Sequence, residues 1–189
     1  MGSARFALLG AAVVAAVAWP PARAGARPSH RASYHTDKTF GLGLMFGSPT
    51  GLSGKLHLDA PIALAFGVGS SYYGHHDHHG DHVHIEGTQL HADVLWHPAV
   101  LVHNPTLQLA LHIGVGGQVR HHHVHDPEPD DGHTHVGVRV PFGLTMDFRR
   151  APVDAFFELA YALEFVGPGS HSYIAGSLGA RYYPGSITV

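Results

Sequence analysis

Histidine is the residue type in this chain with the most evident capacity for chemistry. The 189 residues include 20 histidines, and two short stretches with their flanks contain most of them. One stretch, Gly74 to Ile85, reads GHHDHHGDHVHI, and the other, His121 to His133, reads HHHVHDPEPDDGH. Because neutral imidazole is a good ligand for Zn²⁺, Cu²⁺ and Ni²⁺, both stretches are candidate metal-binding segments. The candidate ligands are His75, His76, His78, His79, His82, His84, His121, His122, His123, His125, His133 and His135.

Acidic residues within the same stretches add possible oxygen ligands, namely Asp77, Asp81, Asp126 and Asp131. No spacing among the histidines specifies a single tetrahedral site, so we expect several interchangeable binding modes of low to moderate affinity and no obligatory cofactor. Two other interpretations stay open. The stretches could be hydrophilic loops that resist insertion into lipid, or a pH switch, since imidazole titrates near pH 6.5. Metal binding competes with that protonation.

The bulk composition excludes several classes of protein. The chain has no cysteine, which rules out disulfides and thiolate metal sites. Its formal net charge is −3, which offers no basis for nucleic-acid binding. Charged residues make up 13% of the chain, about half the usual share of a soluble domain, so a water-exposed surface of ordinary polarity is not expected.

The first residues have the pattern of a secretory signal peptide, assigned to residues 1–24. Arg5 is followed by the apolar run Phe6 to Trp19 and by the small-residue cleavage site Ala22-Arg23-Ala24. Residues 25–38 are polar and unpatterned, and we expect a flexible segment there. Residues 39–184 form the predicted folded domain and residues 185–189 a tail. The mature chain is thus expected to be exported.

The folded domain alternates apolar and polar residues with a period of two, which is the pattern of β-strands. The hairpin from Thr106 to Asp147 shows it best, because both flanks of the second histidine stretch alternate strictly. We expect connections at Gly74–Ile85, Pro98–Pro105 and His121–His133, among others. The predicted fold is all-β, an eight-stranded antiparallel up-and-down transmembrane β-barrel. Its strands are Thr39–Gly47, Leu52–Asp59, Ile62–Tyr73, Glu86–His97, Thr106–Arg120, Thr134–Asp147, Val153–Phe165 and Ser172–Tyr183.

Alternation leaves open which face is inside. A soluble, lipocalin-like carrier in the periplasm would turn its apolar face inwards, and an outer-membrane barrel would turn it outwards. The polar face consists mostly of small residues with a few charges of both signs, which suits the crowded lumen of an eight-stranded barrel. We therefore predict a lumenal ion-pair network of Lys55, Asp93, Arg139, Glu158, Glu164 and Arg181, with His57, His91 and His112 hydrogen-bonded beside it. Pro141 within the sixth strand predicts a bulge or a missing ladder bond.

Several segments resemble a family of small bacterial outer-membrane barrels of the OmpA-type transmembrane kind. They include FGLGLMFGSPTGLSGKLHLD, ADVLWH, HIGVGGQVR, VGVRVPFGL and GARYY, and the stretch from Gly47 to Lys55 is the most specific. The resemblance spans roughly Thr39 to Tyr183 and implies an eight-stranded barrel in the bacterial outer membrane. The chain continues beyond Tyr183, whereas such barrels usually end on a terminal aromatic residue.

Strand parity places both histidine stretches at the same end of the barrel, which is extracellular if both termini are periplasmic. We expect a non-enzymatic outer-membrane barrel, in contact with lipid, whose loops capture divalent transition metals. The alternative is a surface adhesin, with the loops recognising an extracellular protein partner. A lipid-modifying enzyme is disfavoured, because Ser70, the main outward-facing nucleophile, has no strand histidine beside it on that face.

Overall fold

The computed structural model describes residues 33–76, 82–123, 133–166 and 170–185. For residues 72–76, 82–86, 122, 123 and 166 it describes the course of the backbone alone. The predicted signal peptide, the centres of both histidine stretches and the last residues of the predicted tail lie outside the described residues. Among the described residues there is no helix long and apolar enough to cross a membrane.

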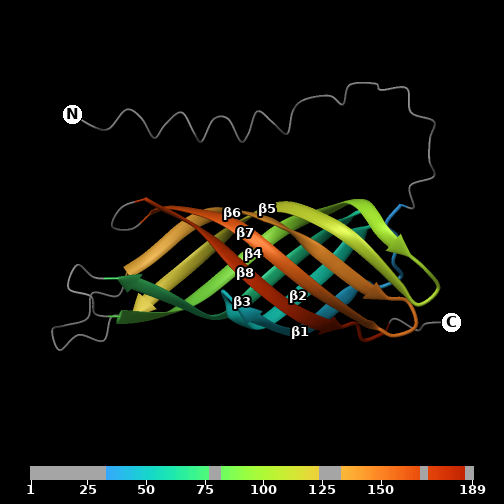
Figure 1. Ribbon diagram of the computed structural model, residues 1–189, viewed down its shortest axis with the longest axis horizontal. Coiled ribbons are helices and arrows are strands. Elements are labelled where there is room, and N and C mark those ends of the chain that lie inside the picture. Colours follow the sequence, from blue (N-terminus) through green and yellow to red (C-terminus); the bar gives the residue numbers. More distant parts are fainter. Residues whose placement is uncertain (1–32, 77–81, 124–132, 167–169, 186–189) are drawn as a thin grey trace, which may run out of the picture. The chain divides into compact units, whose positions relative to one another are not determined.

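Eight antiparallel strands, each bonded to its neighbours in the sequence, close into a barrel through pairing of β1 with β8 (Figure 1). This confirms the predicted up-and-down architecture. The strands are β1 (Phe40–Gly47), β2 (Thr50–Asp59), β3 (Ile62–His76), β4 (His82–His103), β5 (Leu107–His123), β6 (His133–Phe148), β7 (Val153–Val166) and β8 (His171–Tyr182).

The tight connection between β1 and β2 depends on Gly47. Its φ of +124° is a conformation that residues with a Cβ atom rarely adopt. The Thr50 hydroxyl secures the turn, since it donates to the Gly47 carbonyl at 2.9 Å and accepts from the Gly47 N–H at 3.0 Å. The strands therefore reverse within Ser48 and Pro49.

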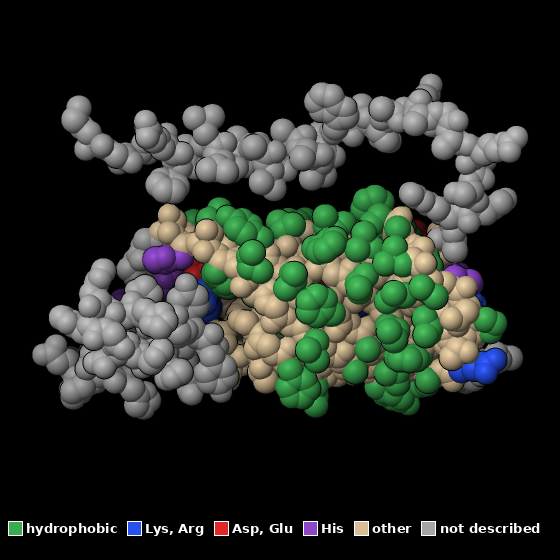
Figure 2. All heavy atoms as spheres, viewed as in Figure 1, with side chains coloured by type: hydrophobic (Ala, Val, Ile, Leu, Met, Phe, Trp, Pro, Cys, Tyr) green, Lys and Arg blue, Asp and Glu red, His purple; other side chains and the backbone are tan. Residues whose placement is uncertain are grey.

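The barrel is apolar outside and polar inside, as the alternation predicted for a membrane protein. Large apolar side chains on every strand are exposed, among them Leu44, Leu52, Val94, Val115, Phe142, Tyr161 and Leu178. Figure 2 shows hydrophobic side chains spread over the visible wall, with charged side chains mainly near its two ends. The buried set instead contains lysine, arginine, aspartate, glutamate, glutamine and histidine. An exposed apolar belt around a buried polar lumen defines a transmembrane β-barrel.

Several strands are longer than the sequence suggested. β3 continues to His76 and β4 begins at His82, so the predicted loop Gly74–Ile85 is largely paired backbone. The predicted connection Pro98–Pro105 was also wrong, because β4 runs on to His103. The β4–β5 ladder has two register shifts, one between Trp96 and Ala99 and one between Val100 and Val102, and the first of them spans Pro98. A bulge tolerates proline because no ladder bond is required there.

Pro141 leaves a gap in one ladder of β6 without changing its register. Towards β5 the ladder pairs stop at Phe142, opposite Ile113, and resume at Arg139, opposite Gly116. Towards β7, Pro141 pairs with Ala160 in an uninterrupted series. The predicted missing bond is therefore found, and the alternative of a bulge at this point is not.

The apolar wall gives a direct test of lipid exposure. Val115 is 60% exposed midway along β5, and Leu101 is 56% exposed near the end of β4. We expect Val115→Arg to lower the free energy of unfolding of the barrel in lipid vesicles by about 2–4 kcal/mol, and Leu101→Arg by about 0–1 kcal/mol. Urea titration followed by the fluorescence of Trp96 measures both. Equal costs for the two variants would contradict this membrane placement.

Candidate functional site

The barrel has two chemically different ends. The terminal end carries residues 33–39, the chain after β8 and the connections β2–β3, β4–β5 and β6–β7. The distal end carries the connections β1–β2, β3–β4, β5–β6 and β7–β8, and therefore both histidine stretches. β3, β4, β5 and β6 are consecutive in the barrel, so the two histidine-bearing hairpins are neighbours.

Backbone pairing brings candidate metal ligands opposite one another at the distal end. His76 is the partner of His82 in the β3–β4 ladder, and His122 is the partner of His133 in the β5–β6 ladder. In the ladder between the hairpins, His123 pairs with Glu86. His75 and His84 pair with Val83 and Gly74. His78, His79 and His125 lie outside the described residues.

Three of the candidate ligands have described side chains, and they differ in exposure. His133 is exposed, His121 is half-buried with Nδ1 2.9 Å from the Thr134 hydroxyl, and His135 is buried. The His135 ring lies 6.5 Å from that of His171, a distal histidine that the sequence analysis did not single out. As these side chains stand, no three metal-ligating groups converge within the described part of the chain.

Below the distal rim, Glu164 accepts hydrogen bonds from side chains of two strands, β5 and β8. Its Oε1 accepts from Gln118 Nε2 at 2.9 Å, from Tyr173 Oη at 3.2 Å and from the Arg120 guanidinium. Its Oε2 lies 3.8 Å from His135 Nδ1. Glu164 was one of the predicted network residues, but its cation is Arg120, which the prediction omitted.

In the middle of the lumen, Arg139 lies between two carboxylates. Arg139 Nε is 3.3 Å from Asp93 Oδ1, and Nη2 donates to Glu158 Oε1. His112 adds to this group, with Nε2 3.4 Å from Glu158 Oε2 and Nδ1 3.0 Å from the Thr145 hydroxyl. His91 Nε2 is 3.8 Å from Asp93. The structure thus brings together three of the six residues of the predicted network.

Lys55 and Arg181 lie closer to the terminal end. Lys55, fully buried, contacts His97, with Nζ 3.0 Å from Nε2. His97 Nδ1 is 3.1 Å from the Pro61 carbonyl, so it donates there and leaves Nε2 to accept from the lysine. Arg181 Nε donates to Asp154 at 3.1 Å, and the Tyr183 hydroxyl donates to the same carboxylate at 2.6 Å.

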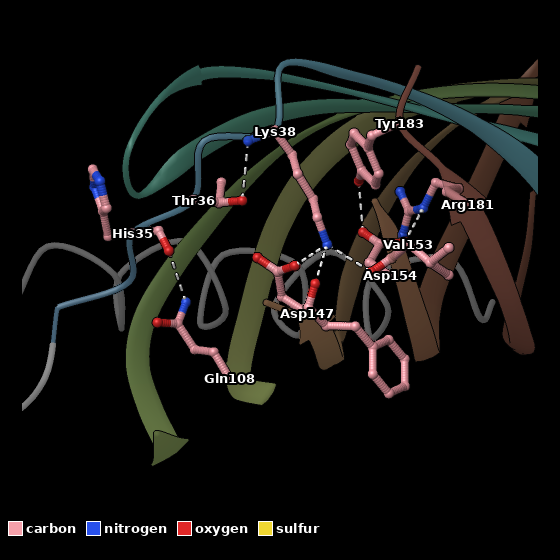
Figure 3. A network of polar contacts seen from close by, with 10 residues as sticks. His35, Thr36, Lys38, Gln108, Asp147, Val153, Asp154, Arg181 and Tyr183 are labelled. Carbon is pink, nitrogen blue, oxygen red and sulfur yellow. Dashed lines mark hydrogen bonds and ion pairs between the residues drawn. The ribbon is translucent and has the colours of Figure 1, made fainter. Parts of the chain in front are cut away.

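The segment before β1, expected to be flexible up to residue 38, is instead docked at its end in the terminal mouth. Tyr34 is 2% exposed, and burial raises the pKa of its phenol. Lys38 is buried, and its ammonium donates to Asp147 and to two backbone carbonyls (Figure 3). The absence of alternation in residues 25–38 excluded a strand, but it could not exclude docking through individual side chains.

The alternation of faces along each strand was sufficient to identify most of the lumenal residues that the prediction missed. Gln89, Arg120, Asp147 and Asp154 occupy the same polar faces as the predicted network and are all buried. Tyr34 and Lys38 had no such signal, because they precede the first strand.

Two of the lumenal contacts, Asp93–Arg139 and His112–Glu158, join strands on either side of a middle strand that has a glycine at that level. Asp93, Gly116 and Arg139 are at one register level of β4, β5 and β6, and His112, Gly143 and Glu158 are at one level of β5, β6 and β7. A Cβ atom on Gly116 would lie 2.1 Å from Asp93 Oδ1. The missing side chain on the middle strand therefore lets groups on its two neighbours meet.

Comparison with solved structures finds eight-stranded outer-membrane barrels. The N-terminal β-barrel domain of Pseudomonas aeruginosa OprF is 18% identical, with a TM-score of 0.46, over 76% of this chain and 93% of that one. Neisserial surface protein A is 13% identical (TM-score 0.44; 76% and 94%). Ail of Yersinia pestis, in complex with the heparin analogue sucrose octasulfate, is 14% identical (TM-score 0.34; 76% and 94%). No family model and no curated protein matches the chain.

The adjacent glycines of β5 provide a matched test of the lumenal packing. Gly116→Ala would place Cβ against Asp93 and the Ala92 carbonyl, and we expect a loss of about 1–3 kcal/mol in the free energy of unfolding. Gly117→Ala on the outer face meets nothing closer than 3.8 Å, and we expect a change within about 1 kcal/mol. Urea unfolding in detergent micelles compares the two. Similar losses in both variants would contradict the close approach at Gly116.

Removing Arg139 tests the central ion pairs. We expect Arg139→Met to cost about 3–5 kcal/mol, because Asp93 and Glu158 would lose their shared cation in a buried position. The same unfolding measurement applies, with the exposed Arg150→Met as control at less than about 0.5 kcal/mol. Adding Asp93→Asn to Arg139→Met should recover part of the loss. A double variant no more stable than the single one would show that charge pairing is not the cause.

Proposed function

We propose that the protein is a non-enzymatic barrel of the bacterial outer membrane whose distal histidines capture Zn²⁺, Cu²⁺ or Ni²⁺ with low to moderate affinity. One observation carries the proposal: histidine is opposite histidine in two neighbouring hairpins, at His76–His82 and His122–His133. Directly opposed residues of an antiparallel pair have Cα atoms about 4.5–5.5 Å apart. Two imidazoles at such positions are within reach of one metal ion.

The surroundings support metal capture at this end of the barrel. Both hairpins extend from adjacent strands, so the two histidine pairs belong to the same end of the barrel rather than being scattered over the surface. In the β4–β5 register His122 is level with Gly87, five positions along β4 from His82. The ladder position His123–Glu86 between the hairpins adds a carboxylate to the imidazoles. His133 and His171 are exposed at the same end, where an ion from solution can reach them.

The orientation in the membrane is part of the proposal. With both termini in the periplasm, the distal end faces the exterior and meets environmental metal. A surface adhesin with hydrophilic or pH-responsive loops is the alternative function, and it would act through a protein partner without metal.

A zinc and copper titration of the refolded full chain in detergent tests the proposal. We expect His122→Gln with His133→Gln to weaken Zn²⁺ binding by about tenfold or more, since loss of even a supporting residue costs a metal site about that much. The matched control is His35→Gln with His103→Gln, which removes two exposed histidines from the terminal end. We expect the control to bind as the unchanged chain does.

Acid should weaken binding by the unchanged chain, because protonated imidazole cannot act as a ligand. Repeating the titration at about pH 5.5, one unit below the reference pKa of histidine, measures this. Equal affinity in the distal variant and the control would contradict metal capture by the paired histidines. The adhesin would then be the better account of the distal end.

A further inference from the structure

The terminal mouth contains a set of oxygens arranged around a primary ammonium. Lys38 Nζ donates to a carboxylate oxygen of Asp147, to the Phe148 carbonyl at 2.9 Å and to the Val153 carbonyl at 2.6 Å (Figure 3). Three acceptors match the three N–H donors of an alkylammonium. The Tyr183 ring, 5.5 Å from Nζ, adds a cation–π contact. We call Asp147, the two carbonyls and the Tyr183 ring the ammonium site.

Strands β6 and β7 and the residue that follows β8 supply every part of this site, and its charge requires a cation. Asp147 and Asp154 are directly opposed in the β6–β7 ladder. Arg181 and Tyr183 satisfy Asp154. Asp147, with its side chain 5% exposed, receives its positive charge from Lys38. A buried carboxylate without a cation is costly, so the ammonium site is built to be occupied.

A second contact holds the segment of residues 33–38 at Tyr34, four residues before Lys38. The Tyr34 ring stacks on His97, with centroids 4.2 Å apart and planes 12° apart, and lies 5.9 Å from His57. Between the two anchors, Gln108 Nε2 donates to the His35 carbonyl at 3.3 Å. None of the described strands pairs with residues 33–38 in a ladder. The segment is thus held by side-chain recognition, in the manner of a bound peptide.

We propose that the terminal mouth is a binding site for an extended peptide carrying a primary ammonium and an aromatic ring, and that residues 33–38 are its tethered occupant. A short tether gives its own segment an effective concentration in the millimolar range, so a free ligand competes poorly while the segment is docked. A peptide with a lysine four residues after a tyrosine fits the site. An arginine fits less well, because its planar guanidinium does not match three convergent acceptors. This inference does not depend on metal capture at the distal end.

Chemical rescue of the emptied site tests the proposal. The full chain carrying Lys38→Ala is refolded in detergent, and its unfolding temperature is measured with n-butylammonium chloride. We expect the substitution to lower that temperature by at least about 5 °C, because Asp147 loses its cation. Butylammonium should raise it again in a concentration-dependent way, whereas tetramethylammonium and guanidinium at equal ionic strength should not.

Three controls isolate the ammonium site. The unchanged chain should not respond to butylammonium, because Lys38 fills the site. Lys38→Ala combined with Asp147→Asn should not respond either, because the carboxylate is gone. Arg150→Ala removes an exposed cation from the same end and should behave as the unchanged chain does. If Lys38→Ala does not refold alone, its refolding yield with and without butylammonium becomes the measurement.

Peptide binding tests the second half of the proposal. A labelled peptide with the sequence of residues 33–39, SYHTDKT, is titrated against Tyr34→Ala with Lys38→Ala and against the unchanged chain. We expect at least about tenfold tighter binding to the double variant, whose own segment no longer competes. No response to butylammonium, or equal peptide binding by the two chains, would overturn the proposal. The segment would then be only a structural strap.

Discussion

The barrel depends on the mutual neutralisation of the charges that it encloses. A wall that faces lipid turns its apolar side chains outwards, and alternation then sends every second side chain into the lumen. Buried charge is tolerated there only with a compensating partner. Arg139 with Asp93, and Arg120 with Glu164, link strands that are not adjacent in the sheet. These pairs therefore neutralise the lumen and also connect strands that are separated by one other strand in the wall.

Such contacts set requirements on residues that carry no charge. Gly116 and Gly143 lie between the partners of a contact, and a side chain on either would fill the space through which the partners meet. Pro141 is accommodated in the same region because Gly114, its neighbour on β5, also lacks a side chain. Glycines on the polar face are thus required at the levels where charged side chains of the two neighbouring strands meet.

The period of two was sufficient to predict the strands and their order, because alternation records directly which residues share a side of a sheet. The polar lumen was predicted from the small residues and the charges of both signs on one of the two faces. It could not predict where strands end. β4 passes through Pro98 because a bulge absorbs the proline, and β3 reaches His76 because backbone pairing continues through polar sequence. Nor could it assign partners: Glu164 binds Arg120 on β5 and Arg139 binds Asp93 on β4, and these choices depend on lumenal depth and side-chain reach. Tyr34 and Lys38 precede all periodicity, so their docking was not predictable.

The ladders extend into the histidine stretches, and this affects the affinity for metal ions that we expect at the distal end. A metal site on a free loop must order its backbone on binding, at about 1–2 kcal/mol per residue. At His122 and His133 the backbone is already paired, so the main costs left are the side-chain rotamers and the protons displaced from the imidazoles. A pair of imidazoles supplies only two of the four ligands that Zn²⁺ prefers, which limits the affinity of each pair. Under the proposed metal capture, two adjacent hairpins of this kind would favour capacity and rapid exchange over tight retention.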